Sequence, residues 1–552
     1  MTTKTNIHGG QAIVEVLKNE GVTKVFGVPG ESYLNVLDAL YEESSIDFIS
    51  ARQEGGASFM AESYAKSTGE VGVCTATRGP GATNLSIGLH TAQQDSTPLV
   101  ALIGQVERNV KDREAFQEVN FVNFFKEICK WTVEINDANR IPEILHRAFH
   151  VARSGRPGPV LVSLPEDMQD DLVTETPYHP IKKSKVYPND EDVKEVANLL
   201  KEAKQPVIIA GGGVILSEAT DQLVTLSEKC SIPVATAFRR FHAFPNKHEN
   251  YIGTLGLGAR EELSKCIYES DLILALGTKF SQMTTDNYTL INEKSKLVHV
   301  DISEETIGRV YSPTLPIVSN VDTFLEKLLD YVEENKDEDR QRYVQNENEK
   351  YVVFSTPSKI ENENYVNLKL VLEYIQNNLS EEKIITSDAG NFFSWISRYY
   401  KFDKNAQYYG PTSGAMGYGM PSAIGAKVAH PNKLVISLSG DGGFMMNPQE
   451  FETAVRYDIP IISIVVNNNL YGTIHTHQEG KFPDRVIGTR LTNPNFAEYA
   501  ENFGGHGERI TKNEDIAGAF ERAIQSKKPA IIEILTDPKI LSANHEVQLE
   551  NK

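Results

Sequence analysis

The stretch "SLSGDGGFMMNPQEFETAVRYDIPIISIVVNNNLYG", residues 437–472, decides the fold of this chain. An apolar run ends in Gly-Asp-Gly, a segment with helical spacing follows, and a second apolar run ends in paired asparagines. We predict two parallel strands joined by a helix, with Asp441 and Asn468 at the carboxyl ends of the strands. In an open α/β sheet, ligands bind at that edge.

These residue types point to a metal–diphosphate site. Glycines 440, 442 and 443 let the backbone approach a phosphate closely, and the N-terminus of the following helix favours anions. A carboxylate and an amide oxygen suit Mg²⁺, which completes its shell with phosphate oxygens and water. The alternative is a tight strand–helix turn followed by an ordinary asparagine turn. A bare "GDG" would favour that alternative, but "NN" at the end of the next strand favours the metal–diphosphate site.

Length and composition predict a multidomain globular protein. A chain of 552 residues is too long for a single hydrophobic core. A composition of 40% hydrophobic and 24% charged residues is ordinary for globular proteins. A net charge of −20 argues against nucleic acid or an anionic membrane as partner. No stretch is apolar enough to cross a bilayer, and "MTTKTNIHGG" lacks a signal-peptide pattern. The four cysteines stand far apart, which fits a reducing compartment, so we expect a cytoplasmic protein.

Short β-branched runs alternate with helical stretches along the whole chain. This alternation predicts the α/β class, with three doubly wound parallel-sheet domains. We expect these domains at residues 1–175, 190–335 and 360–552, with a proline-containing linker after about residue 172. The charged run 331–354 is expected to be a solvated helix rather than a partner-binding tail.

The 437–472 stretch resembles the thiamine diphosphate motif, which begins with GDG and ends in NN nearly thirty residues later. The resemblance extends over almost the whole chain to the acetolactate synthase (acetohydroxyacid synthase large subunit) group of that superfamily. It rests on motifs in the same order: "FGVPGESYLNVLDAL", "RQEGGASFMAESYAKSTG", "TRGPGATN", "AFQE", "SGRPGPVLVSLPEDM" and "GAMGYGMPSAIGAK". It implies a pyrimidine-binding domain, a non-catalytic middle domain and a diphosphate-binding domain. It also implies a homodimer or homotetramer with active sites shared between subunits.

The resemblance assigns site residues by position. Asp441, Asn468 and the Leu470 carbonyl correspond to the Mg²⁺ ligands, and Glu54 to the glutamate that hydrogen-bonds the aminopyrimidine ring. A carboxyl group is needed there to exchange a proton with the ring. By position alone, Glu54 could equally begin a helix and face water. Further cofactor contacts implied by the resemblance are Pro80, Asn84, Gly390, Asn391, Gly414, Met416, Gly442, Gly443 and Gly472.

The resemblance implies decarboxylation of a 2-oxoacid followed by carboligation, with pyruvate as the expected donor. Phe116 and Gln117 match residues that line the substrate end. The chain departs from acetolactate synthases at four positions there, which leaves the acceptor open: Glu31, Ser32, Glu166 and His477. His475 and His477 are either proton shuttles or exposed histidines of a loop that follows the strand.

Alternative activities are a 2-oxoacid decarboxylase without carboligation, or acetyl transfer to phosphate as in sulfoacetaldehyde acetyltransferases. Two alternatives from other functional classes are a catalytically silent homologue and a nucleotide-binding sheet protein without thiamine. The presence of Glu54, Asp441 and Asn468 together speaks against the silent homologue. FAD in the middle domain is disfavoured, because "AGGGVILSEA" fits flavin-bound members but "LGTKFSQMTTDN" lacks their "RFDDR" signature.

Overall fold

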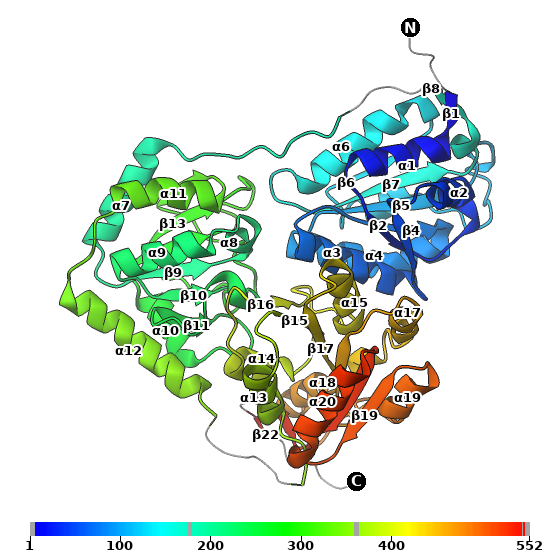
Figure 1. Ribbon diagram of the computed structural model, residues 1–552. Helices are drawn as coiled ribbons and strands as arrows, with labels where there is room; N and C mark the ends of the chain where they lie inside the picture. Colours follow the sequence, from blue (N-terminus) through cyan, green and yellow to red (C-terminus); the bar gives the residue numbers. More distant parts are fainter. Residues whose placement is uncertain (1–5, 175–178, 358–363, 544, 547–552) are drawn as a thin grey trace.

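The computed structural model describes residues 6–174, 179–357, 364–543 and 545–546 (Figure 1). Three six-stranded sheets follow one another along the described chain. Every strand pairing within these sheets is parallel, and helices lie on the sheet faces. The predicted α/β class with three parallel, doubly wound sheets is therefore confirmed.

The first sheet has the strand order β3-β2-β4-β5-β7-β6. Its strands are β2 (Lys24–Gly27), β3 (Asp47–Ser50), β4 (Gly72–Thr77), β5 (Leu99–Gln105), β6 (Trp131–Glu134) and β7 (Pro159–Pro165). The helices of this part are α1 (Gly9–Asn19), α2 (Leu34–Glu42), α3 (Glu54–Thr68), α4 (Arg78–Asp95), α5 (Phe121–Phe125) and α6 (Ile141–Arg153).

The third sheet repeats that order as β16-β15-β17-β18-β20-β19. Its strands are β15 (Lys383–Ser387), β16 (Ala406–Tyr409), β17 (Leu434–Gly440), β18 (Ile462–Asn467), β19 (His506–Ile510) and β20 (Ala530–Leu535). The helices are α13 (Leu368–Asn378), α14 (Phe393–Tyr399), α15 (Gly419–Ala429), α16 (Asp441–Phe444), α17 (Glu450–Arg456), α18 (Gly472–Lys481), α19 (Phe496–Asn502) and α20 (Ile516–Ser526). A short hairpin of β21 (Ile540–Ser542) and β22 (His545–Glu546) follows.

The middle sheet has a different order, β11-β10-β9-β12-β13-β14, which is that of a dinucleotide-binding fold. Its strands are β9 (Pro206–Ala210), β10 (Val234–Thr236), β11 (Tyr251–Thr254), β12 (Leu272–Leu276), β13 (Lys296–Asp301) and β14 (Leu315–Val318). The helices are α7 (Asp190–Glu202), α8 (Gly212–Leu216), α9 (Thr220–Cys230), α10 (Glu261–Glu269), α11 (Val321–Tyr331) and α12 (Glu338–Ser355).

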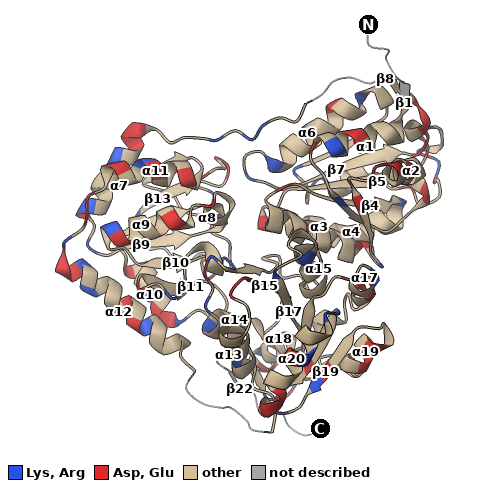
Figure 2. Cartoon of the chain, viewed as in Figure 1, with Lys and Arg blue, Asp and Glu red and all other residues tan. Residues whose placement is uncertain are grey.

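The two segments expected between domains are only partly as predicted. The start of the expected linker forms β8 (Leu172–Thr174), which pairs antiparallel with β1 (Asn6–His8). Of the charged run 331–354, residues 338–354 lie in the helix α12 and residues 332–337 are not helical, and Figure 2 shows acidic and basic residues along α12. It is not solvated throughout, because Arg340 is buried and donates to the carbonyl oxygens of Leu200 and Cys230 at 2.8 and 3.2 Å. Within the described ranges, no helix is both long and apolar enough to cross a membrane.

The first and third sheets meet through α3 and α15, which lie side by side (Figure 1). Gly425 of α15 approaches Met60 of α3 so closely that a side chain at position 425 would collide with the Met60 carbonyl oxygen. Ser63 of α3 donates a hydrogen bond to the Ser422 carbonyl at 2.7 Å. One hydrophobic cluster continues across this contact, so the two parts share a core.

Asp95, the last residue of α4, joins all three parts of the chain through a fully buried side chain. Its carboxylate lies 2.7 Å from Lys66 Nζ, 2.9 Å from Arg240 Nη2 of the middle part, and 2.5 Å from Thr412 Oγ1 of the third part. Burial alone would raise the pKa of Asp95, but Lys66 and Arg240 outweigh it and hold that pKa below its ordinary value.

We predict that Asp95→Asn lowers the stability of the folded chain by about 3–5 kcal/mol, because it removes the buried carboxylate that pairs with Arg240 and Lys66 and leaves Arg240 without an ion-pair partner among the described residues. The urea midpoint measures the loss, with Asp38→Asn on the exposed face of α2 as the control. Because the folded-state pKa of Asp95 is depressed, its contribution is present above the unfolded-state pKa and is lost as the pH falls through the folded value. Equal midpoints for the two variants at neutral pH would contradict this role.

Candidate functional site

The predicted metal ligands lie at the ends of neighbouring central strands. Asp441 directly follows β17 and begins α16, and Asn468 directly follows β18. The two strands pair in parallel, with Gly440 opposite Val466, so both residues reach the same sheet edge. The buried Asp441 carboxylate accepts hydrogen bonds from the Gly442 amide at 2.9 Å and from Asn493 Nδ2 at 2.7 Å. Burial raises the pKa of Asp441, and a bound cation would oppose that rise.

The glycines after Asp441 leave no room for side chains. A Cβ at Gly442 would collide with the Tyr471 ring, and one at Gly443 would lie 2.6 Å from Asp388 Oδ2. Asp388 is fully buried after β15, and burial raises its pKa to about 6. Its Oδ1 accepts the Gly419 amide at 2.6 Å, whereas Oδ2 has no hydrogen-bond partner. The turn therefore brings bare backbone to the edge of the sheet, where a phosphate would bind.

Four further predicted residues lie around this turn. The Leu470 amide donates to Asn468 Oδ1 at 3.1 Å, which folds the chain back after β18. Gly472 begins α18, and Thr473 of that helix donates to Asn391 Oδ1 at 2.9 Å. Asn391 follows Gly390 at the carboxyl end of β15, so the ends of three adjacent strands converge.

Two of the predicted cofactor contacts, Gly414 and Met416, lie on the loop after β16. Met416 is half-buried, and the exposed Gly414 has a φ of 74°, a left-handed conformation that favours glycine. Gly417 also has a positive φ of 80°, and its carbonyl accepts a hydrogen bond from Asn447 Nδ2 at 2.9 Å. The loop is thereby held to the segment that follows Asp441.

The predicted pyrimidine-side residues lie at the corresponding edge of the first sheet. Glu54 is the first residue of α3, and its Oε2 accepts a hydrogen bond from Asn84 Nδ2 at 3.0 Å. Pro80 lies in the first turn of the same helix as Asn84, and both are exposed. The nearby Gly81 is required, because a Cβ there would lie 3.0 Å from Glu54 Oε1.

Three of the four positions that depart from acetolactate synthases converge on residues at the start of α4. Arg78 Nη2 lies 2.6 Å from Glu166, and its Nη1 lies 4.0 Å from the exposed Glu31. Ser32 is buried, and its hydroxyl shares a 2.7 Å hydrogen bond with Thr77. Arg78 has a strained φ of 40°, which is uncommon for a residue with a side chain and typical of functional sites.

Gln117 is half-buried beside this group, with a φ of 66° and its carbonyl accepting the Gly79 amide at 2.9 Å. Phe116 is 74% exposed.

His475 and His477 lie on α18, so the expectation that they belong to a loop is wrong. His475 is buried against Thr489 at 3.2 Å, whereas His477 is exposed, so the two do not form one pair.

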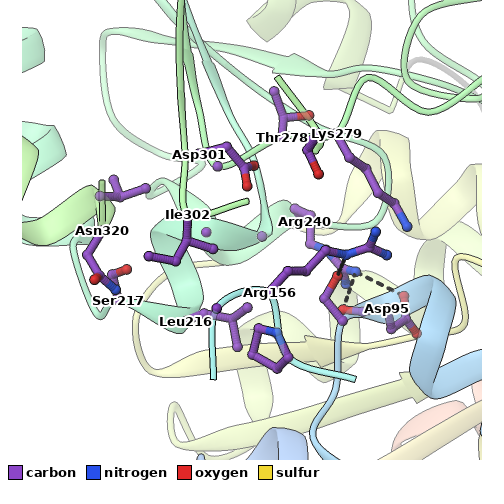
Figure 3. Close-up of a pocket in the computed structure, with 18 of the residues that line it drawn as sticks. Asp95, Arg156, Leu216, Ser217, Arg240, Thr278, Lys279, Asp301, Ile302 and Asn320 are labelled. Atoms are coloured by element: carbon purple, nitrogen blue, oxygen red, sulfur yellow. Dashed lines mark hydrogen bonds and ion pairs between the residues drawn. The ribbon is translucent and has the colours of Figure 1, made fainter. Parts of the chain in front are cut away.

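A second candidate binding site lies at the switch point of the middle sheet, where strand order reverses between β9 and β12. A cavity of about 190 Å³ there is lined by Gly212, Gly213, Gly277, Lys279 and Asp301, with Arg156 from the first part (Figure 3). Lys279 donates to the Gln94 carbonyl, and burial lowers its pKa to about 7, with Arg156 and Arg240 adding to the effect. Among the described residues, neither Lys279 nor Arg156 forms an ion pair with a carboxylate.

Sequence reasoning missed three residues of these sites, Arg78, Asp388 and Asn493, and also Glu450, whose buried carboxylate accepts the Gln53 amide just before Glu54. Asp388 and Asn493 follow or precede regular elements and carry no motif of their own. Arg78 lies inside the quoted motif "TRGPGATN", and its positive charge there was a usable signal, because Glu31 and Glu166 are two acidic residues of the predicted substrate end. Glu450 looks like an ordinary residue of an amphipathic helix.

The donor set at the third sheet fits a magnesium-bound diphosphate. It offers one carboxylate, one side-chain amide oxygen and one backbone carbonyl, all of them oxygen donors. The bare glycine turn, which lets a phosphate approach the backbone closely, lies on the same edge.

Comparison with known proteins agrees with this arrangement. Three family models of the thiamine pyrophosphate enzymes match the chain: the N-terminal TPP binding domain at residues 7–124, the central domain at 193–328 and the C-terminal TPP binding domain at 388–534. The chain is 35% identical over 546 residues to a "Probable acetolactate synthase large subunit" of Methanocaldococcus jannaschii, covering 96% of this chain and 92% of that one. It is 34% identical over 539 residues to the acetolactate synthase large subunit of Lactococcus lactis subsp. lactis, covering 96% and 92%. It is 31% identical over 544 residues to that of Haemophilus influenzae, covering 95% and 93%. With three matching domains and relatives aligned over nearly its full length, the chain belongs to the thiamine pyrophosphate enzymes, in the group of the acetolactate synthase large subunits.

Proposed function

We propose that this protein is an acetolactate synthase, which decarboxylates pyruvate and joins the resulting two-carbon unit to a second 2-oxoacid. The observation that carries the proposal is the oxygen donor set of Asp441 and Asn468 beside a bare glycine turn. The similarity to acetolactate synthase large subunits over nearly the whole chain supports the same activity. When bound, thiamine diphosphate supplies the electron sink that decarboxylation of a 2-oxoacid requires.

The roles of this chain's residues follow from their positions. Asp441, Asn468 and the Leu470 carbonyl would hold Mg²⁺, and the amides of Gly442 and Gly443 would face the diphosphate. Met416 and Gly414 would support the cofactor between its two rings. Pro80 and Asn84 would line the pyrimidine side, and Gly390, Asn391 and Gly472 the diphosphate side.

Glu54 would exchange a proton with the pyrimidine ring. The hydrogen bond from Asn84 fixes one carboxylate oxygen of Glu54 and leaves Oε1 for the ring. Gln117 would line the substrate end. His475 and His477 would transfer protons where a partner subunit or the substrate reaches them.

The ion pairs of Arg78 with Glu166 and Glu31 bear on which acceptor substrate the enzyme uses. Acetyl transfer to phosphate would need an unpaired cation, but Arg78 already faces Glu166 and Glu31. Those carboxylates would repel a phosphate dianion. A decarboxylase without carboligation would need a proton donor in place of the acceptor, and the exposed His477 is the candidate for that role. We therefore favour carboligation, with a 2-oxoacid as acceptor.

We infer that two copies of the chain form the complete active site. Large apolar side chains near the predicted site residues remain exposed in one chain: Ile87, Phe116, Met445, Met446 and Ile474. Ile87 is on the helix of Asn84, Phe116 precedes Gln117, and Met445 and Met446 follow the glycine turn. Exposed apolar surface around a functional site is typical of a protein–protein interface, and a second copy would cover it.

The activity is tested by supplying thiamine diphosphate, Mg²⁺ and pyruvate and measuring carbon dioxide and acetolactate together. We expect about two pyruvates consumed per acetolactate, from the stoichiometry of condensation after one decarboxylation. Glu54→Gln should lower turnover roughly 10²- to 10⁴-fold, the usual contribution of a positioned acid–base group. Acetaldehyde without acetolactate would replace the proposal by a simple decarboxylase, and full activity of Glu54→Gln would remove Glu54 from it.

The metal site is tested by cofactor binding rather than turnover. We expect EDTA to release thiamine diphosphate and added Mg²⁺ to restore binding, because the metal links the protein to the diphosphate. Asp441→Asn should weaken Mg²⁺-dependent binding by about 10- to 100-fold, since it removes a charged ligand. Asp484→Asn at an exposed position is the matched control. Binding of the cofactor by Asp441→Asn with unchanged Mg²⁺ dependence would exclude Asp441 as a ligand.

We infer that the middle cavity binds the phosphates of a nucleotide. Lys279 and Arg156 bring two half-buried basic side chains to a cavity that is also lined by Gly212 and Gly213 at the amino end of α8. The sequence lacks the signature of flavin-bound members, so we expect a nucleotide without flavin. The purified protein should then show no visible flavin absorbance. Lys279→Met should weaken binding of ADP roughly tenfold, the loss of one charged hydrogen bond. A yellow protein that retains FAD would contradict the expectation.

A further inference from the structure

Glu450, the first residue of α17, is fully buried and its carboxylate reaches from the third part of the chain to the first. Its Oε1 accepts the Gln53 amide at 2.9 Å, and both oxygens accept the Arg52 amide at 3.2 Å. Thr453 Oγ1 donates to Oε2 at 2.7 Å. Burial raises the pKa of Glu450, and no described Lys, Arg or His forms an ion pair with it. Backbone amides and one hydroxyl therefore satisfy a buried carboxylate that would otherwise be costly.

The amides that bind Glu450 lie immediately before Glu54. Gln53 is the N-cap of α3, and Glu54 is the first helical residue. A carboxylate at a helix N-terminus is favourable, because the first amides of a helix have no partners within it. The hydrogen bond to the Gln53 amide fixes the residue from which the Glu54 side chain projects.

The close approach also explains a glycine of the "QEGGA" motif. A Cβ at Gly56 would lie 2.6 Å from Glu450 Oε1 and 2.7 Å from the carbons next to it. Such a distance is not tolerated, so position 56 has to lack a side chain if Glu450 is to stay in place. Gly56 also donates its amide to Gln53 Oε1 at 3.1 Å, which completes the cap.

The segment 447–450, which ends at Glu450, also holds the loop that carries Met416. Asn447, three residues before Glu450, donates to the Gly417 carbonyl beside Met416 at 2.9 Å. The Glu450 amide in turn donates to the Asn447 carbonyl at 3.3 Å. Residues 447–450 thus connect the turn after Asp441, the Met416 loop and the start of α3.

We propose that Glu450 is a positioning residue for Glu54: it caps α3 across the contact between two domains and so fixes the carboxyl group that exchanges a proton with the cofactor. This inference rests on the proposed function, because it gives Glu54 that role. The charged or titratable groups around the contact are Arg52, Glu452, Arg456, Tyr457 and Tyr499. Arg52 and Arg456 both form ion pairs with Glu452. Glu450 is therefore the carboxylate that holds the cap.

The test compares Glu450→Gln with Glu54→Gln and with the double variant. We expect Glu450→Gln to lower kcat about 10- to 100-fold, as for misplacement of a catalytic group, with KM for pyruvate and cofactor affinity nearly unchanged. Because Glu450 acts through Glu54, the double variant should be no slower than Glu54→Gln alone. Losses that multiply in the double variant would overturn the inference. No loss in Glu54→Gln would instead overturn the proposed function.

A second variant and a readout on the apoenzyme guard against a folding defect. Gly56→Ala keeps the Glu450 charge but displaces it, so it should lower kcat as Glu450→Gln does. In both variants, hydrogen exchange of the amides in residues 51–57 should be faster than in the parent apoenzyme, whereas exchange elsewhere stays unchanged. Glu452→Gln, which alters the adjacent partly exposed carboxylate, is the control for both measurements. Unchanged exchange at residues 51–57 in Glu450→Gln would overturn the inference without touching the proposed activity.

Discussion

The parallel pairing of β17 with β18 is the constraint on which the rest of the site depends. Because parallel neighbours end at one sheet edge, Asp441 and Asn468 meet although helix α17 lies between them in sequence. A second parallel pairing places β15 on the other side of β17, so Asn391 and the buried Asp388 reach that edge as well. A one-residue shift of β18 would turn Asn467 toward the site and Asn468 away from it, so the strand register selects the ligand.

Central strands and the motifs at their ends could be predicted from the sequence, whereas several edge strands could not. The two apolar runs of the 437–472 stretch became β17 and β18, whose central residues are buried. β6, β11 and β14 lie at sheet edges, where a strand needs fewer apolar residues; β6 is half-buried throughout and β14 alternates between buried and exposed residues. Their short runs therefore lack the apolar signal on which prediction relies.

Motif residues could be placed in the same way, but the residues that support them could not. Glu450 is 397 positions from the Gln53 amide that it accepts, and that partner is backbone, so no pattern of side chains marks the contact. Asp95 likewise reads as the last residue of a helix, and only the packing of three domains makes it a buried ion-pair centre. Local sequence reports which groups can do chemistry, while long-range contacts decide how firmly those groups are held.

The charges around the site divide it into two regions with different demands. At the third sheet, a buried carboxylate with a raised pKa and an unsatisfied Asp388 oxygen call for a cation and for hydrogen-bond donors. At the start of α4, Arg78 is already neutralised by Glu166 and Glu31, so this region adds no positive charge to attract an anion. A metal-bound cofactor would satisfy the first region, which leaves the Arg78 group to shape the space for the acceptor. Glu31, Ser32 and Glu166 thus lie around Arg78 and Thr77, in the first part of the chain, and not at the edge of the third sheet that carries Asp441 and Asn468.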